Sequence, residues 1–117
     1  MAAGTTASMQ VRDIEPRERF EVVLDGELAG FTVYRPHDQV YAFVHTEIDP
    51  AHEGKGLGGT LVRGAMDAMR ERGAAVLPFC PFVAGWLAKH PEYADLVPAA
   101  RRTEFGLPPA QGPSSTR

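Results

Sequence analysis

The chain has 117 residues, a hydrophobic content of 44% and a formal net charge of −3 at pH 7. This length suits one domain with a packed core, and the mildly acidic balance argues against nucleic acid as the main partner. The single cysteine excludes an intramolecular disulfide and a zinc site built from several cysteines. No apolar run approaches the ~20 residues of a membrane helix and no signal-peptide core is present, so we expect a cytoplasmic protein with no membrane partner.

The first part of the chain predicts a β-hairpin. Residues 1–8 are small and polar, and we expect them to form a disordered N-terminal tail. Asp25-Gly26 then separates two runs rich in β-branched and aromatic residues. Both central positions of a type I′ turn need a positive φ, which Asp-Gly tolerates. The pattern therefore predicts strands over residues 20–24 and 27–34.

Residues 40–48 predict a third strand, which Pro50 ends because proline has no N–H to offer a sheet ladder. Side chains alternate between the two faces of a strand, and strict alternation places one set on a common face. That set is Tyr41, Phe43, His45 and Glu47. Both faces are largely apolar, so we expect this strand to be central and covered on both sides.

Four glycines fall within residues 54–59, directly after this strand and before an apolar-periodic stretch. The pattern predicts a strand, a glycine-rich turn and a helix. Such a turn presents free backbone N–H groups at the positive end of a helix dipole. Glycines also let a bulky anion approach that backbone closely. The sequence therefore predicts a phosphate or pyrophosphate site here.

Two other phosphate-loop patterns fit this stretch less well. A P-loop needs Ser or Thr after its Gly-Lys pair, whereas Gly56 follows Lys55. Gly54, Gly56 and Gly59 formally spell the dinucleotide pattern G-x-G-x-x-G. That pattern also needs an acidic residue about 20 residues further on, to hold a ribose hydroxyl. Residues 72–91 contain no Asp or Glu, which disfavours the dinucleotide interpretation.

The second half of the chain predicts a helix, a strand and a second helix. An apolar stripe at helical spacing runs through residues 57–72, and Gly73 is a good helix stop. Residues 74–77 predict a short strand, and a strand–helix–strand connection implies that it pairs in parallel with residues 40–48. Pro81 suits the first position of a short apolar helix over 82–90.

The C-terminal segment from residue 98 is rich in Pro, Ala, Ser and Arg. This composition predicts a disordered C-terminal tail over residues 98–117. One folded domain over residues 9–97 remains.

Residues 48–58 read Ile-x-Pro-x-x-Glu-Gly-x-Gly-x-Gly. This stretch resembles motif A of the GCN5-related N-acetyltransferases, Val-x-Pro-x-x-Arg/Gln-Gly-x-Gly-x-Gly/Ala, with Glu53 as the departure. The stretches 79–83 (Phe-Cys-Pro-Phe-Val) and 90–93 (His-Pro-Glu-Tyr) resemble signatures of a small single-domain branch of that superfamily. Residues 45–47 (His-Thr-Glu) fit the same branch, and the resemblance covers about residues 19–97.

This resemblance implies an α/β (α+β) fold, in which antiparallel strands lead into a splayed parallel pair with the glycine-loop helix between them. It implies acetyl-CoA as a substrate, with its pyrophosphate on the loop amides and its pantetheine between the splayed strands. The four histidines lack metal-ligand spacing, so we expect no metal. The amide of Ile48 would polarise the thioester carbonyl. The implied cofactor-binding residues are Ile48, Gly54, Lys55, Gly56, Leu57, Gly58 and Gly59.

Cys80, His45 and Glu47 are the candidate catalytic residues. Cys80 sits at the expected N-cap before Pro81, where free N–H groups and the helix dipole would stabilise a thiolate. The alternative is a small buried hydrophobe. His45 and Glu47 lie on the strand expected to neighbour Cys80, and either could take a proton from an amine. The alternatives are a core histidine and a surface carboxylate.

Two functions stay open on the sequence. The first is an acetyl-CoA-dependent N-acetyltransferase that passes acetyl directly to an unknown amine, on a small molecule or on a protein. The second is a CoA- or acyl-CoA-binding module with little or no transferase activity. The minimal branch lacks the first two helices that usually help to bind the acceptor, and this chain agrees, because its hairpin leads straight into the motif A strand.

Overall fold

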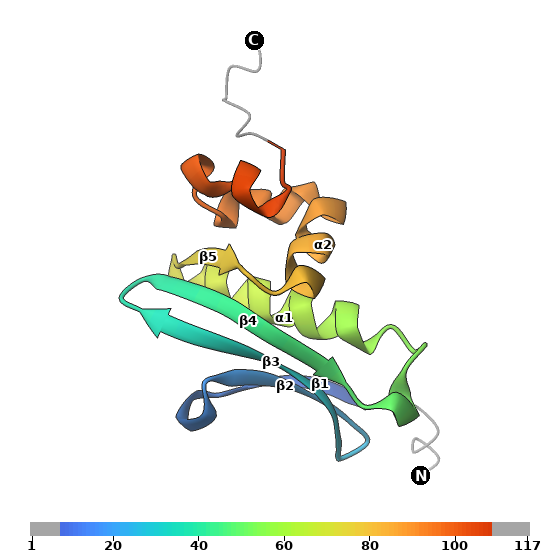
Figure 1. Cartoon of the computed structure of the whole chain (residues 1–117). Coiled ribbons are helices and arrows are strands. Elements are labelled where there is room, and N and C mark those ends of the chain that lie inside the picture. The colour runs from blue at the N-terminus through green and yellow to red at the C-terminus, as the bar shows by residue number, and fades with distance from the viewer. Residues whose placement is uncertain (1–7, 109–117) are drawn as a thin grey trace.

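A computed structural model of the chain describes residues 8–108, which form a five-stranded sheet in the order β1-β2-β3-β4-β5 (Figure 1). The strands are β1 (Met9–Ile14), β2 (Arg19–Leu24), β3 (Glu27–His37), β4 (Val40–Ile48) and β5 (Ala75–Pro78). The helices are α1 (Leu57–Arg72) and α2 (Pro81–Lys89). Short 3₁₀ turns are η2 (Glu15–Arg17), η3 (Pro50–His52), η4 (Pro91–Leu96), η5 (Ala99–Arg101) and η6 (Thr103–Phe105).

The sheet is antiparallel from β1 to β4 and parallel between β4 and β5. The predicted hairpin is confirmed, since Asp25 and Gly26 both adopt a positive φ, of 50° and 86°. The predicted parallel pair is confirmed as well, with α1 as its crossover. The α/β (α+β) class expected from the sequence is therefore the class observed.

Strand β1 was not predicted. It pairs with β2, and its Val11 packs against α1 at Gly64, where an added Cβ would lie 2.8 Å from the valine side chain. On the same strand, Asp13 accepts a hydrogen bond from the Tyr34 hydroxyl at 2.6 Å and pairs with Arg72 of α1. Three of the six residues of β1 are polar, so its placement depends on these distant partners more than on a local pattern.

A β-bulge in β4 changes which side chains share a face. Phe43 pairs with Tyr34 and His45 pairs with Val33, so Val44 is an extra residue without a partner in β3. One extra residue reverses the alternation beyond it. The prediction that Phe43 shares a face with His45 and Glu47 is therefore wrong. The expectation that β4 is covered on both sides is also wrong, because residues 44, 45 and 47 are exposed.

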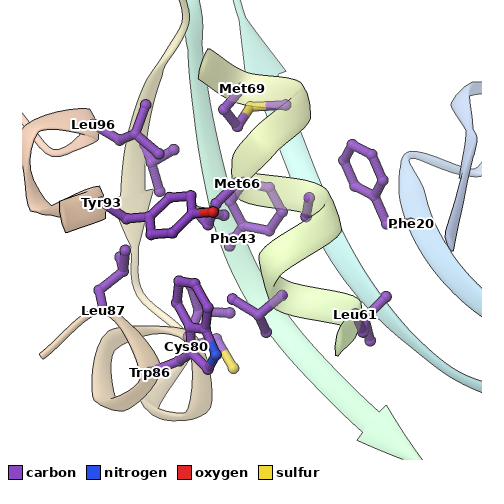
Figure 2. Packing of buried hydrophobic residues seen from close by; sticks show 14 of the residues in the cluster. Phe20, Phe43, Leu61, Met66, Met69, Cys80, Trp86, Leu87, Tyr93 and Leu96 are labelled. Atoms are coloured by element: carbon purple, nitrogen blue, oxygen red, sulfur yellow. The ribbon is translucent and has the colours of Figure 1, made fainter. Parts of the chain in front are cut away.

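Helix α1 is the centre of the core. It lies across one face of the sheet (Figure 1), and Leu61, Val62, Ala65, Met66 and Met69 are fully buried. Figure 2 shows Phe20 on one side of this helix and Trp86, Leu87 and Tyr93 on the other. Gly73 ends α1 with a φ of 65°, as predicted. Neither α1 nor α2, within residues 8–108, is long and apolar enough to span a membrane.

The C-terminal segment packs on the domain as far as the structure describes it. Leu107 is 4% exposed, the rings of Phe105 and Phe79 lie 5.2 Å apart, and Arg102 Nε donates to the Val97 carbonyl. The prediction of a disordered tail from residue 98 is therefore wrong for 98–108, because two apolar anchors are too few to produce a periodic pattern. The remaining tail predictions fall on residues 1–7 and 109–117, outside the described residues, while Ser8 donates to Asp25.

Candidate active site

The parallel strands part at Phe43. Pairing between β4 and β5 ends at Phe43 and Pro78, and the last link is a 2.8 Å bond from the Cys80 amide to the Phe43 carbonyl. Pro81 then starts α2 and leads the chain away. Residues 44–48 of β4 therefore have no β5 partner along this edge, which is the splayed arrangement expected from the sequence.

The amide of Ile48 faces this gap. The next amide, of Asp49, donates to the Ala29 carbonyl at 2.7 Å on the β3 side. Successive amides of a strand point to opposite edges, so the Ile48 N–H points away from β3. Gly30 lets the strands approach here, because an added Cβ would lie 2.7 Å from the Glu47 carbonyl oxygen.

A cavity of about 430 Å³ lies beside the glycine loop. It extends from Thr46 of β4, past the loop, to Phe82 of α2. Every residue predicted to bind the cofactor lines it except Lys55, whose side chain is exposed outside it. The lining residues are Thr46, Ile48, His52, Glu53, Gly54, Gly56, Leu57, Gly58, Gly59 and Phe82.

The loop offers this cavity a row of free amides. Gly54 and Gly56 have φ values of 85° and 74°, which L side chains adopt only with strain. The first helical hydrogen bond runs from the Thr60 amide to the Gly56 carbonyl. Within residues 8–108, the amides of residues 54–59 donate to no acceptor. With the positive end of the α1 dipole behind them, these amides form a cradle for an anion.

Three cavity residues were missed by the sequence reasoning. Thr46 lies between His45 and Glu47, and Phe82 packs its ring where a Cβ on Gly58 would be 2.6 Å away. This contact explains why position 58 is a glycine. The presence of both a glycine motif and a Cys-Pro-Phe motif in the sequence was the signal from which this contact could have been predicted. His52 is the third, and its buried Nδ1 has no hydrogen-bond partner among the described residues.

Cys80 lies at the N-cap of α2, as predicted, and is 4% exposed. Its thiol donates to the Thr46 hydroxyl at 3.3 Å, and that hydroxyl contacts Thr32 Oγ1 at 2.8 Å. Figure 2 shows the cysteine among the packed core residues. The sulfur therefore contacts the cavity wall through its hydrogen bond to Thr46 and does not line the cavity itself.

His45 and Glu47 lie on the opposite face of β4, because of the bulge at Val44. His45 Nε2 and Glu47 Oε2 are 2.7 Å apart, and the side chains are 54% and 59% exposed. The imidazole ring also lies 6.2 Å from the ring of Phe31. The structure thus joins His45 to Glu47 and separates both from Cys80, contrary to the expected neighbourhood. Among residues 8–108 no three metal-ligating side chains come together.

The residues of the His-Pro-Glu-Tyr stretch fasten η4 to the helices. Tyr93 donates from its hydroxyl to Asp67 at 2.7 Å and accepts from Arg63 at 3.1 Å. The bond to Asp67, together with burial, raises the pKa of Tyr93 above its ordinary value. His90 Nδ1 lies 2.7 Å from the Trp86 carbonyl. Both side chains stabilise the fold and do not line the cavity.

Comparison with known proteins places these features in a family. A family model described as GCN5-related N-acetyl-transferase matches residues 19–96. The chain is also 37% identical, over 97 residues, to the streptothricin acetyltransferase of Streptomyces lavendulae, an alignment that covers 81% of this chain and 47% of that protein. The chain thus spans about half the length of this relative.

Two solved structures align with part of this chain. The ribosomal-protein-S18-alanine N-acetyltransferase from Escherichia coli aligns with a TM-score of 0.47 and 24% identity, over 50% of this chain and 38% of that one. Nourseothricin acetyltransferase aligns with a TM-score of 0.41 and 24% identity, over 60% of this chain and 56% of that one. The family match spans well over half of the 117 residues and includes β4, the glycine loop and α1: this chain belongs to the GCN5-related N-acetyl-transferase family.

Proposed function

We propose that this protein transfers an acetyl group from acetyl-CoA to an amine. The observation that carries the proposal is the row of free amides over residues 54–59, which opens onto a cavity running to the gap between β4 and β5. An anion cradle joined to a cavity that reaches Ile48 and Thr46 matches a donor that has a pyrophosphate at one end and an acylated chain at the other.

In this proposal the pyrophosphate lies on the loop amides. Pantetheine then runs along Ile48 and Thr46, toward the point where β4 and β5 part. Glu53 lines the cavity, and its carboxylate would repel a phosphate unless it turned to solvent. Binding therefore depends on the backbone amides more than on side-chain charge, with Lys55 as the nearby cation.

Transfer is direct in this scheme. The amine attacks the thioester carbonyl carbon, the new C–N bond forms, and the C–S bond breaks to release CoA as a thiolate. The Ile48 amide stabilises the oxyanion that forms on the carbonyl oxygen, which is worth on the order of 3 kcal/mol. The amine approaches from the face of β4 that carries Glu47, opposite the cavity, and Glu47, hydrogen-bonded to His45, accepts the proton that the amine loses, directly or through water.

A second candidate is a CoA-binding module with little or no transferase activity. β3 leads into β4 through a two-residue turn, and within residues 8–108 no α-helix precedes the motif A strand to hold an acceptor. The chain also covers only about half of its streptothricin acetyltransferase relative. Both facts leave the identity of the acceptor less well defined than that of the acetyl donor.

Thiol release separates the two candidates. The protein is incubated with acetyl-CoA and a panel of amines, and free CoA thiol is measured with a thiol reagent. The panel contains streptothricin, nourseothricin and a peptide with an N-terminal alanine, which the names of the relatives mention, and a lysine peptide as a general protein amine. Amine-dependent release supports the transferase. Tight acetyl-CoA binding by calorimetry without release supports the binding module.

A further inference from the structure

A second cavity, of about 310 Å³, lies where β3 begins and β4 ends. Phe31 and Glu47 are direct partners in the register of these strands, so both side chains lie on the face of the sheet away from Cys80. The base of the proposed reaction therefore also lines this cavity. The lining residues are Leu28, Ala29, Gly30, Phe31, Glu47, Asp49 and Pro50.

The second cavity carries negative charge. Side chains two positions apart along a strand point to the same face, about 7 Å apart, and Glu47 and Asp49 both line the cavity. Asp49 accepts a hydrogen bond from the Ala51 amide at 2.9 Å through Oδ1, which holds its carboxylate in place. None of the described lining residues is Lys, Arg or His. The cavity therefore favours a ligand with positive charge.

The rest of the wall is apolar. Leu28 is 44% exposed although it is a large apolar residue, and Phe31 and Pro50 line the same cavity. The guanidinium of Arg19 lies 4.3 Å from the centre of the Phe31 ring, but its charge is paired with Glu21 at 2.7 Å. A cavity of this volume, with apolar walls and a few polar groups, suits a small organic molecule.

The two carboxylates flank the residue whose amide faces the gap between β4 and β5. Ile48 lies between Glu47 and Asp49 in sequence, and it lines the first cavity, beside the glycine loop, instead. A ligand in the second cavity therefore lies on the other side of β4 from the acetyl donor. An attacking amino group at Glu47 leaves Asp49 for a second charged group.

We propose that the second cavity binds the acceptor and that the acceptor is a small diamine. One amino group reaches Glu47 and is acetylated, while the second stays an ammonium ion paired with Asp49. An apolar body between the two amino groups packs on Leu28 and Phe31. The proposal rests on the proposed function, because it takes acetyl transfer at the Ile48 amide as the reaction.

Two acceptors of equal size test the second charge. The diamine p-xylylenediamine carries an ammonium group where p-ethylbenzylamine carries a methyl group. Thiol release from acetyl-CoA should give a KM about fivefold lower for the diamine, corrected for its two equivalent amino groups, as for one exposed charge pair. Equal KM values for the two amines, or faster turnover of a lysine peptide than of the diamine, overturn the proposal.

Asp49→Asn tests which carboxylate holds the second charge. Asparagine keeps an oxygen for the Ala51 amide and removes the negative charge, so the fold should be kept. The KM of p-xylylenediamine should rise about fivefold, and that of p-ethylbenzylamine should stay unchanged. Asp38→Asn is the matched control, since Asp38 is exposed in the β3–β4 turn at a φ of 56°, which asparagine also adopts. It should change neither KM. An Asp49→Asn protein that keeps its preference for the diamine contradicts the proposal.

Leu28→Ser tests the apolar wall. It should raise the KM of both amines about fourfold, the value of one buried methylene group. Met9→Ser, at a residue of β1 that is 42% exposed and outside the cavity, should change neither. Unchanged KM values in a folded Leu28→Ser protein contradict packing on this wall. If the wild type releases no CoA with any amine, the proposed function fails too; if it acetylates amines without preferring the diamine, only the acceptor assignment is wrong.

Discussion

The thiol of Cys80 donates a hydrogen bond to the hydroxyl of Thr46 at 3.3 Å, and this bond links the N-cap of α2 to the wall of the cavity beside the glycine loop. Cys80 is 4% exposed and sits behind Thr46, so a bound thioester would meet the threonine first. A thiol in this position can orient the Thr46 hydroxyl in the cavity wall. A relay through it also gains little energy, because acetyl-CoA and acetyl-cysteine are both thioesters.

We therefore expect no acetyl-cysteine intermediate. Intact mass spectrometry of the protein with acetyl-CoA and no acceptor should show no hydroxylamine-sensitive adduct of one acetyl group. Cys80→Ala should lower turnover and keep the fold and CoA affinity. A stable adduct that is lost in Cys80→Ala and chased by amine would establish double displacement. If Cys80→Ala turns over like the wild type, Cys80 has only a packing role.

Gly56→Val should abolish most CoA binding. Gly56 is the N-cap of α1 and has a φ of 74°, where a β-branched residue is strained, so the amides of the loop would move out of register. Gly26→Val is the matched control, because Gly26 has a φ of 86° in the β2–β3 hairpin, far from the loop in sequence. Calorimetry with CoA, on variants checked by circular dichroism, should show the loss for position 56 alone. Equal affinity of the two variants would contradict an amide cradle.

Glu47→Gln should reduce turnover with little effect on CoA affinity. Glu47 lies on the face of β4 opposite the cavity beside the glycine loop, and a general base contributes about 10²- to 10⁴-fold to rate. The measurement is kcat with the best amine of the panel, beside the dissociation constant for CoA. His45→Gln should show the same pattern to a smaller degree, since His45 acts through its bond to Glu47. Unchanged kcat in both variants would exclude this pair as the base.

Tyr34→Phe should cost about 1 kcal/mol of stability at pH 7, the net value of one hydrogen bond. Burial disfavours the phenolate and Asp13 accepts the hydroxyl proton, so the pKa of Tyr34 is raised in the fold. A raised pKa contributes stability below the unfolded value, about 10, and this contribution is lost as the pH rises above it. Urea unfolding should show that the difference in free energy of unfolding between wild type and Tyr34→Phe narrows above pH 10. A difference that widens above pH 10 would contradict a contribution from the raised pKa of Tyr34.

Leu107→Ala should destabilise the protein by about 2 kcal/mol or more, because Leu107 is 4% exposed in the core. Thr103→Ala, at an exposed position of the same segment, should stay within about 0.5 kcal/mol. Thermal or urea unfolding of both variants is the measurement. If both are neutral, the segment from residue 98 adds no stability to the domain.

The sequence by itself determined the order of the central elements and the position of the glycine loop. Asp25-Gly26, Gly73 and Pro81 each impose a backbone conformation that few alternatives allow, so the hairpin, the helix stop and the start of α2 fell where they were predicted. The glycine loop was equally local, because glycine spacing before an apolar stripe is a property of a dozen neighbouring residues. These features need no information from distant parts of the chain.

Only the tertiary structure decided which side chains meet. The bulge at Val44 is set by pairing with β3, and it turns His45 and Glu47 away from Cys80 and brings Thr46 to the thiol instead. Strand β1 and the segment around Leu107 likewise depend on contacts with residues far away in sequence. A single extra residue in a strand, or a single buried anchor, leaves no periodic signal, because its energy comes from the partner strand or core that it packs against.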